Sequence, residues 1–101
     1  MKAVISQPMK GKSVEQIKQE RAGLVELLLK KGYIVEDTVF TFTDDLSEDR
    51  HSLFCLGRVI SLIAAMDAVV FMDGWEEARG CRIEHACCKE YGVPILYTKD
   101  L

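Results

Sequence analysis

One carboxylate near the end of the chain has the setting that nucleophilic chemistry requires. Glu84 is expected two turns into a helix that ends at Tyr91, with apolar neighbours on either side. A glutamate held inside a crevice can attack the anomeric carbon of a sugar and hold the sugar as a covalent intermediate. Any catalytic hypothesis for this chain therefore depends on where the fold places Glu84.

The segment around Glu84 predicts a β–loop–α–β unit. The uninterrupted apolar run 68–72 is typical of a strand that is buried on both faces, in the centre of a parallel sheet. Asp73-Gly74 ends the run, a helical pattern follows, and Gly92 is the expected C-terminal cap. Because open parallel sheets bind ligands at loops of this kind, the loop before the helix is expected to border a site.

The remaining elements extend this alternation. Strands are expected at 2–5, 33–43, 68–72 and 93–97, and helices at 14–31, 51–66 and 76–91. The order predicts a single α/β domain over residues 1–101, a Rossmann- or flavodoxin-like three-layer fold with helices on both faces of a four-stranded parallel sheet. The expected strand order is 2-1-3-4, with its switch point between the first and third strands. The loops that leave those strands, Ser6–Lys12 and Asp73–Arg79, should therefore converge on one crevice.

Gly11-Lys12-Ser13 offers a second interpretation of that crevice, because it matches the end of a phosphate-binding loop. However, Ser6 stands where that motif begins with glycine. Pro8 also removes one of the backbone amides that would hold a phosphate. The pattern therefore disfavours a phosphate-loop NTPase.

A metal site is a third interpretation. Cys81, His85 and Cys88 fall at i, i+4 and i+7, on one face of the expected helix. Zinc sites usually draw their ligands from two separate elements, and the sequence has no matching pair elsewhere. Helix packing is the favoured role of these side chains, and we expect neither a metal nor a cofactor.

Arg21 interrupts the apolar stripe of the first helix. The favoured interpretation is an arginine whose stem crosses the edge of the core while its charged head reaches water. The alternative is an anion ligand near the site.

Composition limits the possible partners and the compartment. The chain has a formal net charge of -3 and no basic run longer than two residues, which argues against a nucleic-acid surface. No apolar stretch approaches the roughly 20 residues of a membrane span, and the N-terminus lacks the apolar region of a signal peptide. The four cysteines form no C-x-x-C motif, so reduced thiols in a cytoplasmic protein are expected.

A homo-oligomer, most simply a dimer, is also expected. A chain of 101 residues covers a doubly wound sheet poorly, and the second helix is apolar nearly all round. Its apolar residues are Leu53, Phe54, Leu56, Val59, Ile60, Leu62 and Ile63.

Three stretches resemble the nucleoside 2-deoxyribosyltransferase superfamily, and more closely its small uncharacterised branch from bacteria and phages. They are Ile5-Ser-Gln-Pro-Met-Lys-Gly11, the strand opening with Asp67, and Gly74-Trp-Glu-Glu-Ala-Arg-Gly-Cys-Arg-Ile-Glu-His-Ala86 before Tyr-Gly-Val-Pro-Ile95. The resemblance covers nearly the whole chain. The spacing of Trp75, Gly80 and Glu84 is its most specific part.

The resemblance implies a site for a nucleoside or nucleotide, with Glu84 at the position of the catalytic glutamate. Gly80 would let the start of the helix approach the sugar. The other implied ligand-binding residues are Ser6, Gln7, Met9 and Gly11 in the first loop, and Asp73, Gly74 and Trp75 on the opposite wall.

Two positions depart from the superfamily pattern. A second catalytic aspartate would stand at or near Val59, and another would match Ala78, where only Glu76 and Glu77 are close. Such groups normally assist departure of the leaving base. Two functions therefore stay open: an enzyme that cleaves or exchanges an N-glycosidic bond, and a module that binds or sequesters nucleotides without chemistry.

Overall fold

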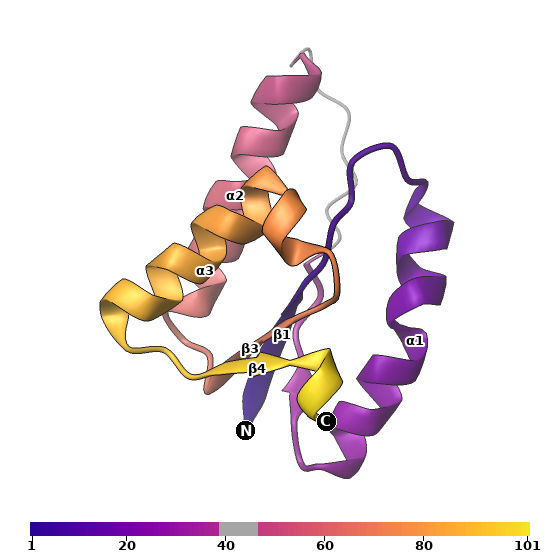
Figure 1. Ribbon diagram of the computed structural model, residues 1–101, viewed down its shortest axis with the longest axis vertical. Coiled ribbons are helices and arrows are strands. Elements are labelled where there is room, and N and C mark those ends of the chain that lie inside the picture. Colours follow the sequence, from indigo (N-terminus) through magenta and orange to yellow (C-terminus); the bar gives the residue numbers. More distant parts are fainter. Residues whose placement is uncertain (39–46) are drawn as a thin grey trace.

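The computed structural model describes residues 1–38 and 47–101, which fold as three layers (Figure 1). The elements are β1 (Lys2–Ser6), α1 (Val14–Lys30), β2 (Ile34–Val35), α2 (Glu48–Ile63), β3 (Ala68–Phe71), the 3-10 turn η1 (Trp75–Glu77), α3 (Arg79–Tyr91), β4 (Ile95–Tyr97) and the 3-10 turn η2 (Thr98–Asp100). This order confirms the predicted alternation of strands and helices.

The four strands form one parallel sheet with the order β2-β1-β3-β4, as predicted. β1 and β3 occupy its centre, where Ser6 pairs with Phe71 at the carboxyl end of both strands. Every residue of β3 is buried, which explains why its sequence is an apolar run rather than an alternating one. The N-terminus lies at the opposite end of the molecule from the loop that follows β1 (Figure 1).

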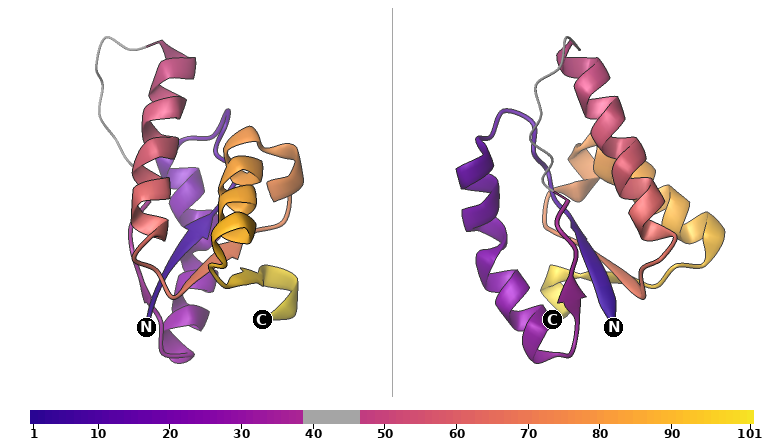
Figure 2. Two further views of the ribbon diagram at one scale, coloured as in Figure 1. Left: turned by 90° about the vertical axis from the view of Figure 1, so that its left-hand side faces the viewer. Right: turned by 180° about the vertical axis from the view of Figure 1, so that it is seen from behind.

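Side chains alternate between the two faces of the sheet and build a core on each. On one face, Val4, Val69 and Phe71 pack with residues of α2 and α3 such as Val59 and Cys88. On the other face, Ile5 and Val70 pack with Leu28 of α1. The sheet thus lies between α1 and the pair α2–α3 (Figure 2), which confirms helices on both faces.

Element boundaries differ from the predicted ones near the crevice. α2 begins at Glu48, one turn before the expected start, because the Ser47 side chain accepts a hydrogen bond from the Arg50 amide and caps the helix. α3 begins at Arg79, because the residues before it form η1 instead of the first helical turn. β2 is only two residues long, and residues 39–43 of the predicted second strand lie outside the described residues.

No helix in the described ranges combines the length and the apolar character that crossing a bilayer requires.

Candidate functional site

A cleft of about 740 Å³ opens at the carboxyl ends of β1 and β3. Its walls are the loop after β1, the middle of α2, and the start of α3. It brings together most of the residues that the sequence predicted, namely Ser6, Gln7, Met9, Gly11, Gly74, Gly80 and Glu84. The volume falls in the range of small-molecule sites.

The two loops meet because they leave adjacent parallel strands. The Met72 amide donates a hydrogen bond to the Ser6 carbonyl at 3.0 Å, which continues the pairing of β1 and β3 beyond the sheet. Gly74 then turns the chain with a φ of 90°, and a Cβ built on it would lie 3.6 Å from Cγ of Pro8. Glycine therefore gives both the left-handed turn and the close approach of the two loops.

Glu84 lies at the floor of this cleft. Its residue is only 8% exposed, and its Oε1 accepts a hydrogen bond of 2.6 Å from the Ser6 hydroxyl. Burial raises the pKa of Glu84 to about 7, while the Ser6 hydrogen bond acts in the opposite direction. The carboxyl is therefore divided between its neutral and ionised forms near neutral pH, and the ionised form is less stable here than in water.

Cys81 lines the same floor, one turn before Glu84 on α3. Burial raises the pKa of its thiol to about 11, with a smaller contribution from the charge of Glu84. Cys81 is consequently a neutral thiol at physiological pH and not an activated nucleophile.

The side chain of Gln7 is committed to the protein itself. Its Oε1 accepts a hydrogen bond from Nε of Arg21 at 2.9 Å. Its Nε2 donates to the Ile17 carbonyl at 3.1 Å and to Oε1 of Glu20 at 3.0 Å. These bonds anchor the loop after β1 to α1, so the Gln7 side chain holds the cleft wall in place.

The environment of Arg21 matches neither of the two roles considered from the sequence, a charged head in water or an anion ligand. It is only 6% exposed, so its head does not reach water, and its second donor group bonds the Thr38 hydroxyl at 3.2 Å. Burial lowers the pKa of Arg21, and the charge of Asp37 opposes that shift. The buried guanidinium joins α1, the β1 loop and the chain after β2, which is a structural role that the interrupted apolar stripe did not reveal.

The phosphate-loop interpretation finds no support in the geometry. The Lys12 ammonium pairs with Glu20 of α1 at 2.9 Å. The Ser13 hydroxyl accepts the Gln16 amide at 3.1 Å and caps α1. Both residues that would contact a nucleotide and its metal in such a loop are thus used to begin the helix.

Asp73 and Trp75 are not placed on the wall of this cleft. Asp73 borders an adjacent groove of about 430 Å³ that shares Gln7, Pro8 and Lys12 with the cleft. Its Oδ1 accepts a hydrogen bond from the Thr98 hydroxyl at 3.4 Å. The Trp75 ring stacks on His85, with centroids 4.0 Å apart. η1 therefore turns Trp75 toward the opposite side of α3.

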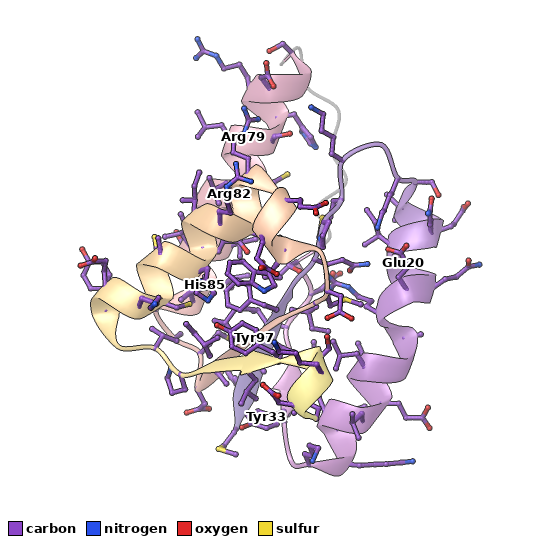
Figure 3. All side chains as sticks on the ribbon, viewed as in Figure 1. Glu20, Tyr33, Arg79, Arg82, His85 and Tyr97 are labelled. Carbon is purple, nitrogen blue, oxygen red and sulfur yellow. The ribbon has the colours of Figure 1, made fainter. Side chains whose placement is uncertain are left out.

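His85 belongs to an aromatic cluster of Phe71, Trp75, His85 and Tyr97. Its Nε2 lies 2.7 Å from the Tyr97 hydroxyl, and the two side chains lie together beside β4 in Figure 3. Cys88 is fully buried in the core. Within the described part of the chain no three His, Cys, Asp or Glu side chains form a group that could hold a metal ion.

Two sets of cleft residues go beyond the ligand-binding and catalytic residues that were predicted from the sequence. The first is a stripe on α2, where His51, Cys55 and Val59 all line the cleft. The second is basic. Lys10 and Lys12 come from the loop after β1. Arg79 and Arg82, labelled in Figure 3, come from the start of α3. The i, i+4, i+8 spacing was the signal for the first set, whereas the basic residues are scattered along the sequence and converge only in the fold.

The start of α3 adds polar groups to the cleft. Its N-cap is Ala78, which offers no side-chain hydrogen bond to the first helical amides. Val59 and Ala78, where the resemblance would place carboxylates, both line the cleft as apolar residues. The wall around Glu84 is therefore less acidic than the resemblance implies.

Comparison with known proteins identifies a family without an assigned activity. A family model described as a domain of unknown function (DUF4406) matches residues 1–97. Searches of curated proteins and of solved structures each found no match. Since the match covers nearly the whole chain, the protein belongs to the DUF4406 family.

Proposed function

We propose that this cleft binds a nucleoside or nucleotide and that Glu84 cleaves or exchanges its N-glycosidic bond. The observation that carries the proposal is a buried carboxyl with a pKa of about 7 at the floor of a cleft large enough for such a ligand. The resemblance of the Trp75, Gly80 and Glu84 spacing to 2-deoxyribosyltransferases supports the same chemistry.

In this mechanism the ionised Glu84 attacks C1′ of the sugar. The C1′–N bond breaks, its electron pair leaves with the base, and the sugar remains bound to Glu84 as an ester. Water then attacks C1′ in hydrolysis, or a second base attacks in exchange. In either case the Glu84 carboxylate is regenerated.

Burial of Glu84 favours this reaction energetically. The ionised carboxylate is destabilised in the empty cleft, as its raised pKa shows. Positive charge develops on the sugar ring in the transition state and interacts with the carboxylate more strongly there than in the ground state. The Ser6 hydroxyl fixes one carboxylate oxygen, so little reorientation is needed during the reaction.

The start of α3 suits the sugar and a polar group attached to it. A Cβ built on Gly80 would meet no protein atom within 4 Å, so the missing side chain leaves open space in the cleft. Arg79, Arg82 and the first amides of α3 border that space. Arg79 donates to Asp49 at 3.4 Å and Arg82 to the Glu76 carbonyl at 3.1 Å, and each guanidinium group has further N–H donors for a ligand. These groups support a ligand with hydroxyl or phosphate oxygens.

The second candidate function is nucleotide binding without turnover. The observation that favours it is the apolar character of Val59 and Ala78, which removes the carboxylates expected to assist the leaving base. A protein of this kind would sequester or sense the ligand. It would keep the cleft and lose the reaction.

The assembly and the compartment are also part of the proposal. Leu53 and Phe54 on α2 are 60% and 40% exposed, which supports a homodimer formed through this helix. The four cysteines are free thiols, which supports a reducing, cytoplasmic setting. Light scattering that gives the mass of one chain at micromolar concentration would contradict the dimer.

The test combines binding with product formation. A panel of common nucleosides and mononucleotides is screened by thermal unfolding, where a ligand at about a hundredfold over its Kd contributes roughly 2.7 kcal/mol and raises Tm by several degrees. The same samples are analysed for free base by chromatography. Base release supports the enzyme, and a Tm shift without base release supports the binding module. The absence of both effects would contradict the proposed site.

A further inference from the structure

One face of α2 presents a histidine to the same cleft as Glu84. His51, Cys55 and Val59 follow one another at i, i+4 and i+8, and all three line the cleft. Glu84 faces the cleft from α3, a different element. The nucleophile of the proposed reaction and an imidazole thus border the same cleft from two different helices.

The proposed reaction needs a proton donor. When the C1′–N bond breaks, the base takes the electron pair and must be protonated to leave readily. The resemblance would place acidic residues at positions 59 and 78. The side chains present there, Val59 and Ala78, cannot donate a proton. The donor must come from another group that lines the cleft.

The other titratable groups that line the cleft suit this role less well. They are Lys10 and Lys12 of the β1 loop, Asp49 and Cys55 of α2, Glu77 of η1, and Arg79, Cys81 and Arg82 at the start of α3. The reference pKa values of carboxyl, ammonium and guanidinium side chains as classes lie well away from 7. Burial raises the pKa of both thiols. Imidazole is the side chain that both gives and takes a proton near pH 7.

We propose, on the basis of the function proposed above, that His51 is the general acid and base of the reaction. The imidazolium gives its N–H proton to the leaving base as the C1′–N bond breaks and Glu84 bonds to C1′. The neutral imidazole then takes a proton from the water, or from the incoming base, that attacks C1′. The cycle returns both residues to their starting states, and no further reactant is needed.

Cys55 is a positioning residue in this arrangement. Its Sγ lies 3.6 Å from Nε2 of His51, one turn along α2. In the proposal, this contact is one restraint on the orientation of the imidazole. The pair is not a nucleophilic dyad, because burial raises the pKa of the Cys55 thiol instead of lowering it.

The test compares two substrates that differ in their need for a proton. The base of 2′-deoxyguanosine must be protonated to leave, whereas the base of 7-methyl-2′-deoxyguanosine already carries a positive charge. His51→Gln should lower kcat/KM for the first by about 10²- to 10⁴-fold and change the second by less than about threefold. Spontaneous loss of the methylated base is subtracted, and melting curves verify folding. His85→Gln, which changes the histidine outside the cleft, serves as the matched control.

The outcomes separate this inference from the proposed function. Wild-type turnover that His51→Gln leaves unchanged for both nucleosides overturns the role of His51 alone. Equal losses for both nucleosides also overturn it, because they show a structural or binding role. A wild type that cleaves neither nucleoside overturns the reaction and the role of His51 together. A selective loss for 2′-deoxyguanosine supports the proposal.

Discussion

Glu84 and His85 are neighbours in sequence but belong to opposite sides of α3. Glu84 lines the cleft and accepts a short hydrogen bond from Ser6, and burial disfavours its charged form. His85 faces the aromatic cluster, where it stacks on Trp75 and lies within hydrogen-bond distance of Tyr97. Burial and the charge of Lys89 lower the pKa of His85, so its neutral form is the one that packs.

The difference means that ionised Glu84 lowers the stability of the folded state, whereas His85 contributes to it. The aromatic cluster satisfies His85 by stacking and hydrogen bonding, as a folded core requires. Glu84 gains little from the fold in its ionised form, and a well-packed neutral residue would be more stable there. Such a cost is typical of groups that act on a ligand.

The largest expected effect is on turnover. Glu84→Gln keeps the Ser6 hydrogen bond but removes the nucleophile, so kcat/KM for base release should fall by roughly 10³-fold or more. His85→Gln should retain nearly full activity per folded molecule. The measurement is chromatography of free base with melting curves of each variant. Equal turnover of wild type and Glu84→Gln would show that Glu84, like His85, is not needed for catalysis.

Substitutions of Glu84 and His85 should change the free energy of unfolding in opposite directions. The folded-state pKa of Glu84, about 7, is raised above its ordinary value of 4.5, so the native state binds the extra proton between these values and loses stability as pH rises through them. Glu84→Gln removes this loss and should stabilise the protein at pH 8 by roughly 3 kcal/mol, and by much less at pH 4.5. His85→Gln should instead destabilise it by about 1 kcal/mol at pH 8.

Urea unfolding at both pH values provides the measurement for this pair. If Glu84→Gln is less stable than wild type at pH 8, the carboxylate is a structural group and the contrast with His85 fails.

Trp75 tests the placement of the cluster. Trp75→Leu should lower the free energy of unfolding by about 2 kcal/mol, because it removes ring contacts with Phe71, His85 and Tyr97. The Kd of a ligand identified by the nucleotide panel should change by less than about threefold, since Trp75 does not line the cleft. Calorimetric titration measures the Kd. A large loss of affinity would indicate that Trp75 contacts the ligand, as the sequence analysis predicted.

The smallest expected change in stability is at Gly80. Gly80→Ala should stabilise α3 by at most about 1 kcal/mol, because its methyl group meets open space and alanine favours the helix. Because Gly80 lines the cleft, the added methyl group should weaken ligand binding by about tenfold. Thermal unfolding with and without ligand measures both effects. Unchanged affinity would show that the ligand does not approach the start of α3.

The fold was predictable because each element carries its own local signal. The apolar run 68–72, the capping residue Ser13 and the glycine at 92 mark strand, helix start and helix end, and they agree with the observed elements. The start of α2 was misplaced because the charged residues Glu48, Asp49 and Arg50 look like a surface loop until Ser47 is recognised as their cap.

The site was predictable in part. Topology alone places Ser6 and Gly74 on one crevice, since the loops after adjacent strands must meet. The bonds that commit Gln7 to Arg21 and α1 depend on tertiary geometry, and no spacing in the sequence encodes them. η1 turned Trp75 away from the cleft for a similar reason, because a 3-10 turn changes the direction of side chains relative to a continuous helix.

The most direct test of the account is a search for the covalent intermediate on Glu84. A 2′-fluoro-substituted nucleoside slows both steps, because fluorine at C2′ destabilises the positive charge of the transition state, and the ester on the enzyme should accumulate. Intact-mass measurement followed by peptide mapping should find one added sugar on Glu84 in wild type and none in Glu84→Gln. An adduct on another residue, or a nucleoside that binds and leaves Glu84 unmodified, would contradict the proposed role of Glu84.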